Sequence, residues 1–187
     1  MLTEIAIIEK KYTAAEYFEF EKRSEIRHEF VDGNLIPMPG ESKIANKIAG
    51  NLYFSLRGTL NLKVFELFNH DVRLMLADEK LYRYPDVMVA PVADDEDTHA
   101  VRQPILLVEV FSVNSLKTDT IDKPREYFAL PSLQYYLVLS QDETFAELYT
   151  RKENDWIFSY FTKLEEEIIL EKLGVKFTLK MIYEDVF

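Results

Sequence analysis

The chain has 187 residues and a mass of 22.0 kDa, enough for one well-buried core and too short for two ordinary domains without an evident linker. It contains no cysteine, which excludes disulfides and thiolate metal sites, and no apolar run long enough to cross a bilayer. The net charge of −11 argues against a protein that binds phosphate backbones over its whole surface, although a local cleft can still be electropositive.

These observations predict a single domain over residues 1–187, with its main core at about 12–140 and an antiparallel extension with a closing helix at about 141–187. The first residues carry acid where a signal peptide would carry base. Together with the lack of cysteine, this favours a cytoplasmic location.

Capping and turn signals predict the first elements. Thr13 has the form of a helix N-cap and predicts a helix to about residue 22. Apolar segments at 28–31 and 34–38 flank Asp32-Gly33, a dipeptide favoured in tight hairpin turns. This pair of segments is therefore predicted to be a β-hairpin.

Apolar periodicity predicts the elements that follow. A helix is predicted over 42–58, because apolar residues recur there every four positions: Ile44, Ile48, Leu52 and Leu56. The predicted strands are 63–68, 71–76, 86–91, 105–111, 133–139, 143–150, 155–162 and 167–170. Asp119, Lys123 and Tyr127 share one face of a further predicted helix, with Pro124 in or near its first turn. A short closing helix is predicted over 178–187. Helices mixed with an interrupted run of strands predict an α/β (α+β) domain around a mixed sheet.

Three carboxylates and one lysine beside these strands are the candidate functional residues: Glu29, Asp86, Glu109 and Lys123. Glu109 lies inside the apolar run 105–111, where an ionised carboxylate is costly unless it is paired or binds a metal. Two carboxylates on neighbouring strands can hold Mg²⁺ or Mn²⁺, and a nearby lysine can orient the attacking water. Such a group would suit phosphodiester hydrolysis.

A simpler interpretation of each carboxylate stays open at this point. Acidic residues at strand ends are often helix N-caps, partners of a lysine, or solvated groups. The three histidines, His28, His70 and His99, are too scattered to indicate an imidazole metal site and are interpreted as structural or exposed.

The order of these residues resembles the Uma2 family, a bacterial branch of the PD-(D/E)XK nuclease superfamily. The resemblance covers residues 12 to 186. In the first half of the chain it rests on Glu29 with Val31-Asp32-Gly33, on Pro39-Gly40, on Gly50-Asn51-Leu52 and on Pro85-Asp86-Val87. In the second half it rests on Val108-Glu109-Val110 with Ser112 and Ser115, on Asp119, Lys123 and Tyr127, and on Tyr135-Tyr136. It implies a restriction-endonuclease-like mixed β-sheet core flanked by helices.

The resemblance also implies a role for each site residue. Asp86 and Glu109 would bind the metal with the carbonyl of Val110, Lys123 would be the catalytic lysine, and Glu29 an additional acidic residue, with Ser112 a weaker candidate. The superfamily's usual lysine position holds Phe111 here, so the lysine would reach back from the following helix. A histidine common in the family's first long helix is replaced by Ala45.

The expected function is therefore a Mg²⁺-dependent DNA endonuclease, with Mn²⁺ as a substitute ion and a homodimer as the expected assembly. The alternative is a catalytically inactive nuclease-fold module that acts through protein–protein contacts, which the acidic charge and the 13% aromatic content favour. A hydrolase of small phosphoesters comes last, since the sequence contains no glycine-rich phosphate loop.

Overall fold

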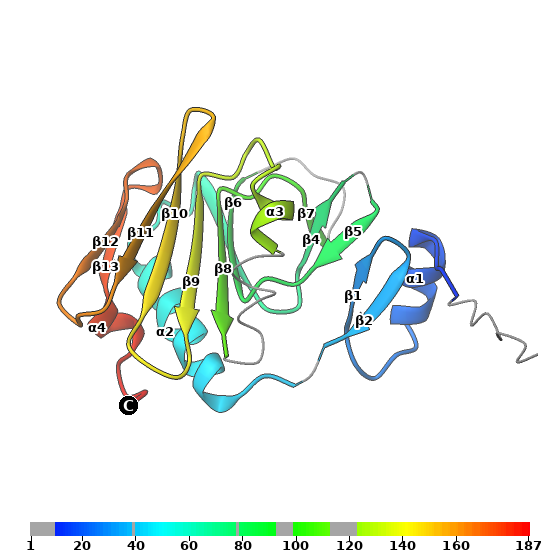
Figure 1. Ribbon diagram of the computed structural model, residues 1–187, viewed down its shortest axis with the longest axis horizontal. Helices are drawn as coiled ribbons and strands as arrows, with labels where there is room; N and C mark the ends of the chain where they lie inside the picture. The colour runs from blue at the N-terminus through cyan, green and yellow to red at the C-terminus, as the bar shows by residue number, and fades with distance from the viewer. Residues whose placement is uncertain (1–9, 39, 78, 93–98, 113–122) are drawn as a thin grey trace, which may run out of the picture. The chain divides into compact units, whose positions relative to one another are not determined.

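The computed structural model describes residues 10–38, 40–77, 79–92, 99–112 and 123–187. The chain forms two compact units, residues 1–40 with 75–83, and residues 41–74 with 84–187. Figure 1 shows the helices and strands of both units. Among the described residues, no helix has both the length and the apolar character that spanning a membrane requires.

The first unit contains helix α1 (Ala14–Glu21) and strands β1 (His28–Val31), β2 (Asn34–Pro37) and β5 (Leu81–Arg83). Thr13 caps α1 in a capping box, since its hydroxyl accepts from the Glu16 N–H and the Glu16 carboxylate accepts from the Thr13 N–H. The predicted hairpin is confirmed: β1 and β2 are antiparallel, and Asp32 and Gly33 both have positive φ. Positive φ at both central residues is the requirement of a tight type I′ turn.

The second unit contains a six-stranded sheet in the order β11-β10-β9-β8-β6-β3 (Figure 1). Its strands are β3 (Phe65–Asn69), β6 (Val87–Pro91), β8 (Leu106–Phe111), β9 (Tyr135–Ser140), β10 (Ala146–Lys152) and β11 (Asp155–Phe161). The pairing of β8 with β9 is parallel and the other pairings are antiparallel. The sheet is therefore mixed, as predicted, and β8 is a central strand with a neighbour on each side.

Helix α2 (Lys43–Thr59) packs its apolar stripe against one face of this sheet. Ser42 caps the helix, with its hydroxyl accepting from the Ala45 N–H at 3.0 Å. Ile48, Leu52 and Leu56 are fully buried and share one core with Val108 of β8 and apolar residues of β6 and β9. Ile44, predicted in the same stripe, is 40% exposed. Ala45 takes its place in the buried face, because the burial follows the i, i+3, i+4 spacing of 45, 48, 49 and 52.

Helix α3 (Lys123–Tyr127) lies on the opposite face of the sheet from α2 (Figure 1). Successive side chains of a strand point to opposite faces, so Val108 joins the α2 core while Glu109 points to α3. Tyr127 packs edge-on against Tyr136 of β9, with ring centroids 5.4 Å apart. Pro124 is the second residue of α3, in the first turn as predicted, where its missing N–H costs no helical hydrogen bond.

The remaining strands form two further pairings. β12 (Glu167–Leu170) pairs with β13 (Val175–Thr178), the 3₁₀ helix η2 (Glu171–Leu173) connects them, and α4 (Leu179–Ile182) follows. Strand β4 (Arg73–Leu76) pairs in parallel with β7 (Ala100–Val101) through Arg73 and Leu74.

The structure differs from the sequence predictions in the pairing of one strand, in three strands that were not predicted, and in the length of the closing helix. Residues 167–170 do not extend the large sheet, because β12 pairs with β13, a strand that the sequence analysis missed. The short strands β5 and β7 were also missed, since three and two residues are too few to show a period. The closing helix is limited to α4, and Asp119 lies outside the described residues.

Candidate functional site

Asp86 is fixed against β8 by contacts on both sides of Glu109. It lies one residue before β6, and its backbone N–H donates to the Val108 carbonyl at 3.1 Å. Its carboxylate Oδ2 accepts from the Val110 N–H at 2.6 Å. Val108 and Val110 flank Glu109 in β8, so the structure brings the two predicted metal-binding carboxylates to neighbouring positions of adjacent strands.

Glu109 is held by two side chains of α3. Its Oε2 lies 2.8 Å from Lys123 Nζ, and its Oε1 accepts from the Tyr127 hydroxyl at 2.9 Å. Glu109 is 3% exposed and Lys123 is 7% exposed. A buried carboxylate with an opposite charge and a further donor is compensated. The lysine partner considered for the simpler interpretation is therefore present, and it is the same Lys123 that was predicted for the site.

The Asp86 carboxylate is the perturbed acid of this group. Burial raises its pKa from 3.8 to about 6, against the lowering effects of the Val110 N–H, Lys123 and His70. Glu41 raises the pKa further through charge repulsion.

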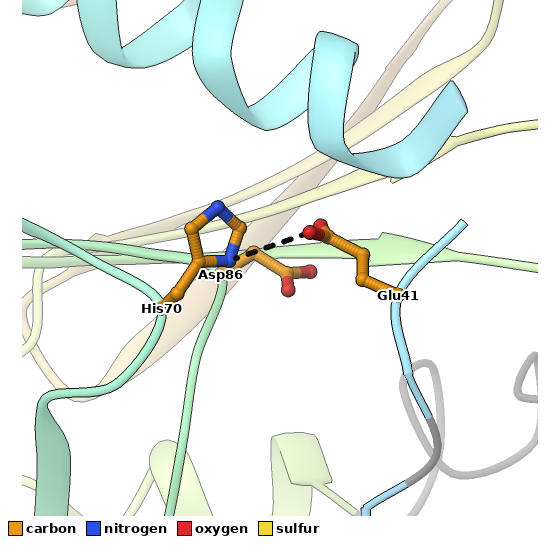
Figure 2. Close-up of side chains that lie close together, drawn as sticks. All are labelled: Glu41, His70 and Asp86. Carbon is orange, nitrogen blue, oxygen red and sulfur yellow. Dashed lines mark ion pairs between the residues drawn. The ribbon is translucent and has the colours of Figure 1, made fainter. Parts of the chain in front are cut away.

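Glu41 and His70 lie beside Asp86 (Figure 2). One potential ligand atom from each of Glu41, His70 and Asp86 falls within 4.8 Å of the others. His70 Nδ1 is 3.8 Å from Glu41 Oε2, which also accepts from Asn46 Nδ2 at 2.8 Å. Imidazole nitrogens and carboxylate oxygens are both common ligands of divalent cations in proteins.

The other predicted site residues have different surroundings. Glu29 belongs to the first unit, where its Oε2 lies 2.5 Å from Arg83 Nη1 in a buried ion pair. Its role as an additional acidic residue stays a prediction. Ser112 is half-buried directly after β8. Pro39, Ser115 and Asp119 lie outside the described residues.

Glu41 was not predicted from the sequence as a site residue. His70 was interpreted as structural or exposed, because the three histidines were considered together. His70 follows β3 directly, and its N–H donates to the Asp86 carbonyl at 3.0 Å. The antiparallel pairing of β3 with β6 places the end of β3 beside the start of β6. This pairing skips the intervening β4 and β5 and was not predicted from the sequence. The interpretation of the other two histidines is confirmed: His28 is buried against Glu21, and His99 is exposed.

Comparison with solved structures identifies the class of fold. The structure is similar to the crystal structure of "a putative nuclease belonging to DUF820" from Anabaena variabilis ATCC 29413, with a TM-score of 0.71 at 13% identity. The match covers 94% of this chain and 99% of that chain. The predicted fold class, a nuclease-like mixed sheet flanked by helices, is therefore confirmed.

The chain belongs to the Uma2 family, whose model is described as "Putative restriction endonuclease" and matches residues 14–181. Two relatives come from Synechocystis sp. (strain ATCC 27184 / PCC 6803 / Kazusa). The uncharacterized protein sll1609 is 36% identical over 71% of this chain and 76% of its own length. The uncharacterized protein slr1290 is 29% identical over 92% of each chain. The family resemblance read from the motifs is confirmed.

Proposed function

We propose that the chain is a divalent-metal-dependent endonuclease that hydrolyses phosphodiester bonds of DNA, with Mg²⁺ as its ion and Mn²⁺ as a substitute. The observation that supports this most strongly is the buried contact of Lys123 with Glu109 beside Asp86. Family membership supports the same class of reaction. The site combines two carboxylates and one ammonium group, the combination that metal-assisted hydrolysis needs.

The residues fit a hard divalent cation. The Asp86 carboxylate is costly to ionise where it lies, and a cation nearby would relieve that cost. Asp86, Glu109 and the carbonyl of Val110 would hold the ion, since Mg²⁺ takes oxygen ligands. When bound, such an ion lowers the pKa of a water molecule and offsets negative charge on the phosphate.

The chain's own residues would supply positioning and charge. Glu109 holds the Lys123 ammonium beside Asp86, where it can donate to the attacking water or to a phosphate oxygen. In the reaction, the water oxygen bonds to phosphorus and one P–O ester bond breaks. The leaving oxygen takes up a proton, so water is consumed once for each strand cut. The Tyr127 hydroxyl keeps Glu109 in place as a positioning residue.

The assembly and location are part of the same proposal. We propose a homodimer, which would bring two sites to two DNA strands, and a cytoplasmic location, which the absence of cysteine favours. Strand β11 is an edge of the large sheet and exposes Ile157, Phe158 and Tyr160, as interface strands often do. Light scattering after size exclusion should give a mass near twice 22.0 kDa, and a monomer at micromolar concentration would contradict this part.

Incubation of purified protein with supercoiled plasmid and with single-stranded DNA tests the reaction itself. Cleavage is expected in Mg²⁺ or Mn²⁺ and none in excess chelator. Absence of cleavage of both substrates by folded protein that demonstrably binds Mn²⁺ would overturn the proposal. The alternative, a non-catalytic module with the nuclease fold, would then gain weight, since the exposed apolar residues of β11 also suit a protein partner.

A further inference from the structure

We propose that Glu41, His70 and Asp86 form a second cation position, one that uses an imidazole nitrogen and therefore favours transition-metal ions over Mg²⁺. This inference rests on the proposed function, because Asp86 would be a ligand of both cation positions. The second position differs from the first by two ligands, Glu41 and His70, which take the place of Glu109 and the Val110 carbonyl.

Three separate segments of the second unit converge at this position (Figure 2). Glu41 immediately precedes the Ser42 cap of α2, His70 follows β3, and Asp86 precedes β6. The pairing of β3 with β6 brings two of them together, with the His70 N–H bound to the Asp86 carbonyl. The position is thus built by the sheet and the start of the long helix, and two of its three ligands sit on strand ends.

The spacing is close to that of a bound ion. Ligand atoms 2.0 to 2.2 Å from one metal lie roughly 3 to 3.5 Å apart, and here they lie within 4.8 Å of one another. The Glu41 and His70 side chains are 28% and 30% exposed, so both have room to rotate. A shift of about 1 Å by these two side chains would complete a three-ligand set and leave further positions for water.

The charges favour a cation there. Two carboxylates, Glu41 and Asp86, belong to the group, and the Asp86 side chain is half-buried. Two nearby anions repel, and a divalent ion between them replaces that repulsion with attraction.

The ligand types set the choice of ion. Mg²⁺ requires oxygen ligands in near-ideal octahedral geometry, whereas imidazole suits Zn²⁺ and related ions. Affinity for one nitrogen and two oxygen ligands should therefore rise from Mg²⁺ through Mn²⁺ to Zn²⁺. Participation of the His70 imidazole, and not the affinity order alone, distinguishes the second position from an all-oxygen site formed by Asp86, Glu109 and the Val110 carbonyl.

The test is Zn²⁺ binding by isothermal titration, combined with NMR of ¹⁵N-labelled histidine side chains in the full chain. On addition of Zn²⁺, the ring signals of His70 should shift while those of His28 and His99 stay within error. The variants His70→Ala and Glu41→Gln should each weaken Zn²⁺ binding at least tenfold. Excess Mg²⁺ should not displace Zn²⁺ from the wild type.

Matched control variants show whether a loss of Zn²⁺ binding is specific to Glu41 and His70. His99→Ala removes an exposed histidine and Glu66→Gln an exposed glutamate of β3, and both should bind Zn²⁺ like the wild type. Glu109→Gln should leave the His70 shift in place. The proposal is overturned if the His70 signals do not move, or if His70→Ala and Glu41→Gln bind as the wild type does. Failure of the proposed function would instead show as absent DNA cleavage with Zn²⁺ binding intact.

Discussion

The substitution Asp86→Asn should change how stability depends on pH in metal-free protein. The Asp86 pKa is raised in the folded state, mainly by burial, so the folded protein favours the protonated carboxyl more than the unfolded chain does. The stability that this group contributes is full below its unfolded pKa of 3.8 and is lost as pH rises through about 6. Asn carries no titrating charge and keeps an oxygen acceptor for the Val110 N–H.

The size of the effect follows from the shift. The rise from 3.8 to about 6 corresponds to about 3 kcal/mol at 1.36 kcal/mol per pH unit. Because the carboxyl is already partly ionised in the unfolded chain at pH 4, about 2 kcal/mol of this falls between pH 4 and pH 8. The free energy of unfolding of Asp86→Asn, relative to wild type, should therefore increase by about that amount over this range.

Urea unfolding of both proteins in chelator, at steps between pH 4 and pH 8, measures this difference. The exposed Asp155 of β11 provides a control, because Asp155→Asn should follow the wild-type pH profile within error. Wild type and Asp86→Asn profiles that run parallel would refute the reasoning. They would mean that burial does not penalise the Asp86 charge, and one support for a cation site would be lost.

Three further substitutions and one control test the packing around the site and the fold, each measured as a free energy of unfolding in urea. Tyr127→Phe removes a donor to the buried Glu109 carboxylate and should cost about 1 to 3 kcal/mol; no loss would mean that the hydroxyl is dispensable. Leu52→Ala should cost about 2 to 5 kcal/mol because Leu52 is fully buried under the sheet. The control Phe54→Ala, at an exposed residue of the same helix, should change the free energy of unfolding by less than about 0.5 kcal/mol. Equal costs would contradict the assigned helix face. Gly33→Ala should cost about 1 kcal/mol, since φ is +83° and an added Cβ meets neighbouring atoms at 3.2 Å; an unchanged stability would argue against the turn.

Local signals in the sequence predicted most of the secondary structure. The Thr13 cap, the Asp32-Gly33 turn and the stripe of α2 all depend on residues close together in the chain. The apolar run 105–111 predicted a strand, and the strand observed there, β8, has β6 and β9 as neighbours. The single domain over 1–187, with its boundary near residue 140, stays a prediction.

Pairing between strands that are distant in the chain was beyond the reach of the sequence. The partner of β3 is β6, which follows it only after β4 and β5. Such a pairing depends on packing across the whole unit and leaves no local period. The position of His70 beside Asp86 depends on this pairing, so it escaped sequence analysis.

The part of the site that lies on one strand and one helix was predictable. A glutamate inside an apolar strand needs a partner, and the four-residue spacing of Lys123 and Tyr127 put two donors on one helical face. Both donors contact Glu109. The position of Glu29 in the first unit, beside Arg83, could not be foreseen, because the short strand β5 that carries Arg83 was itself missed.

The most direct test of the central claim is the rate of plasmid nicking by wild type and by Lys123→Met, at saturating DNA and Mn²⁺, with Glu66→Gln as the surface control. If Lys123 acts at the reacting phosphate, its loss should slow nicking by about 10²- to 10³-fold, the usual effect of removing one electrostatic group from an active site. Circular dichroism should show that the variant is folded, and Glu66→Gln should nick at the wild-type rate. Equal nicking by wild type and folded Lys123→Met would contradict the assignment of this site as a nuclease centre.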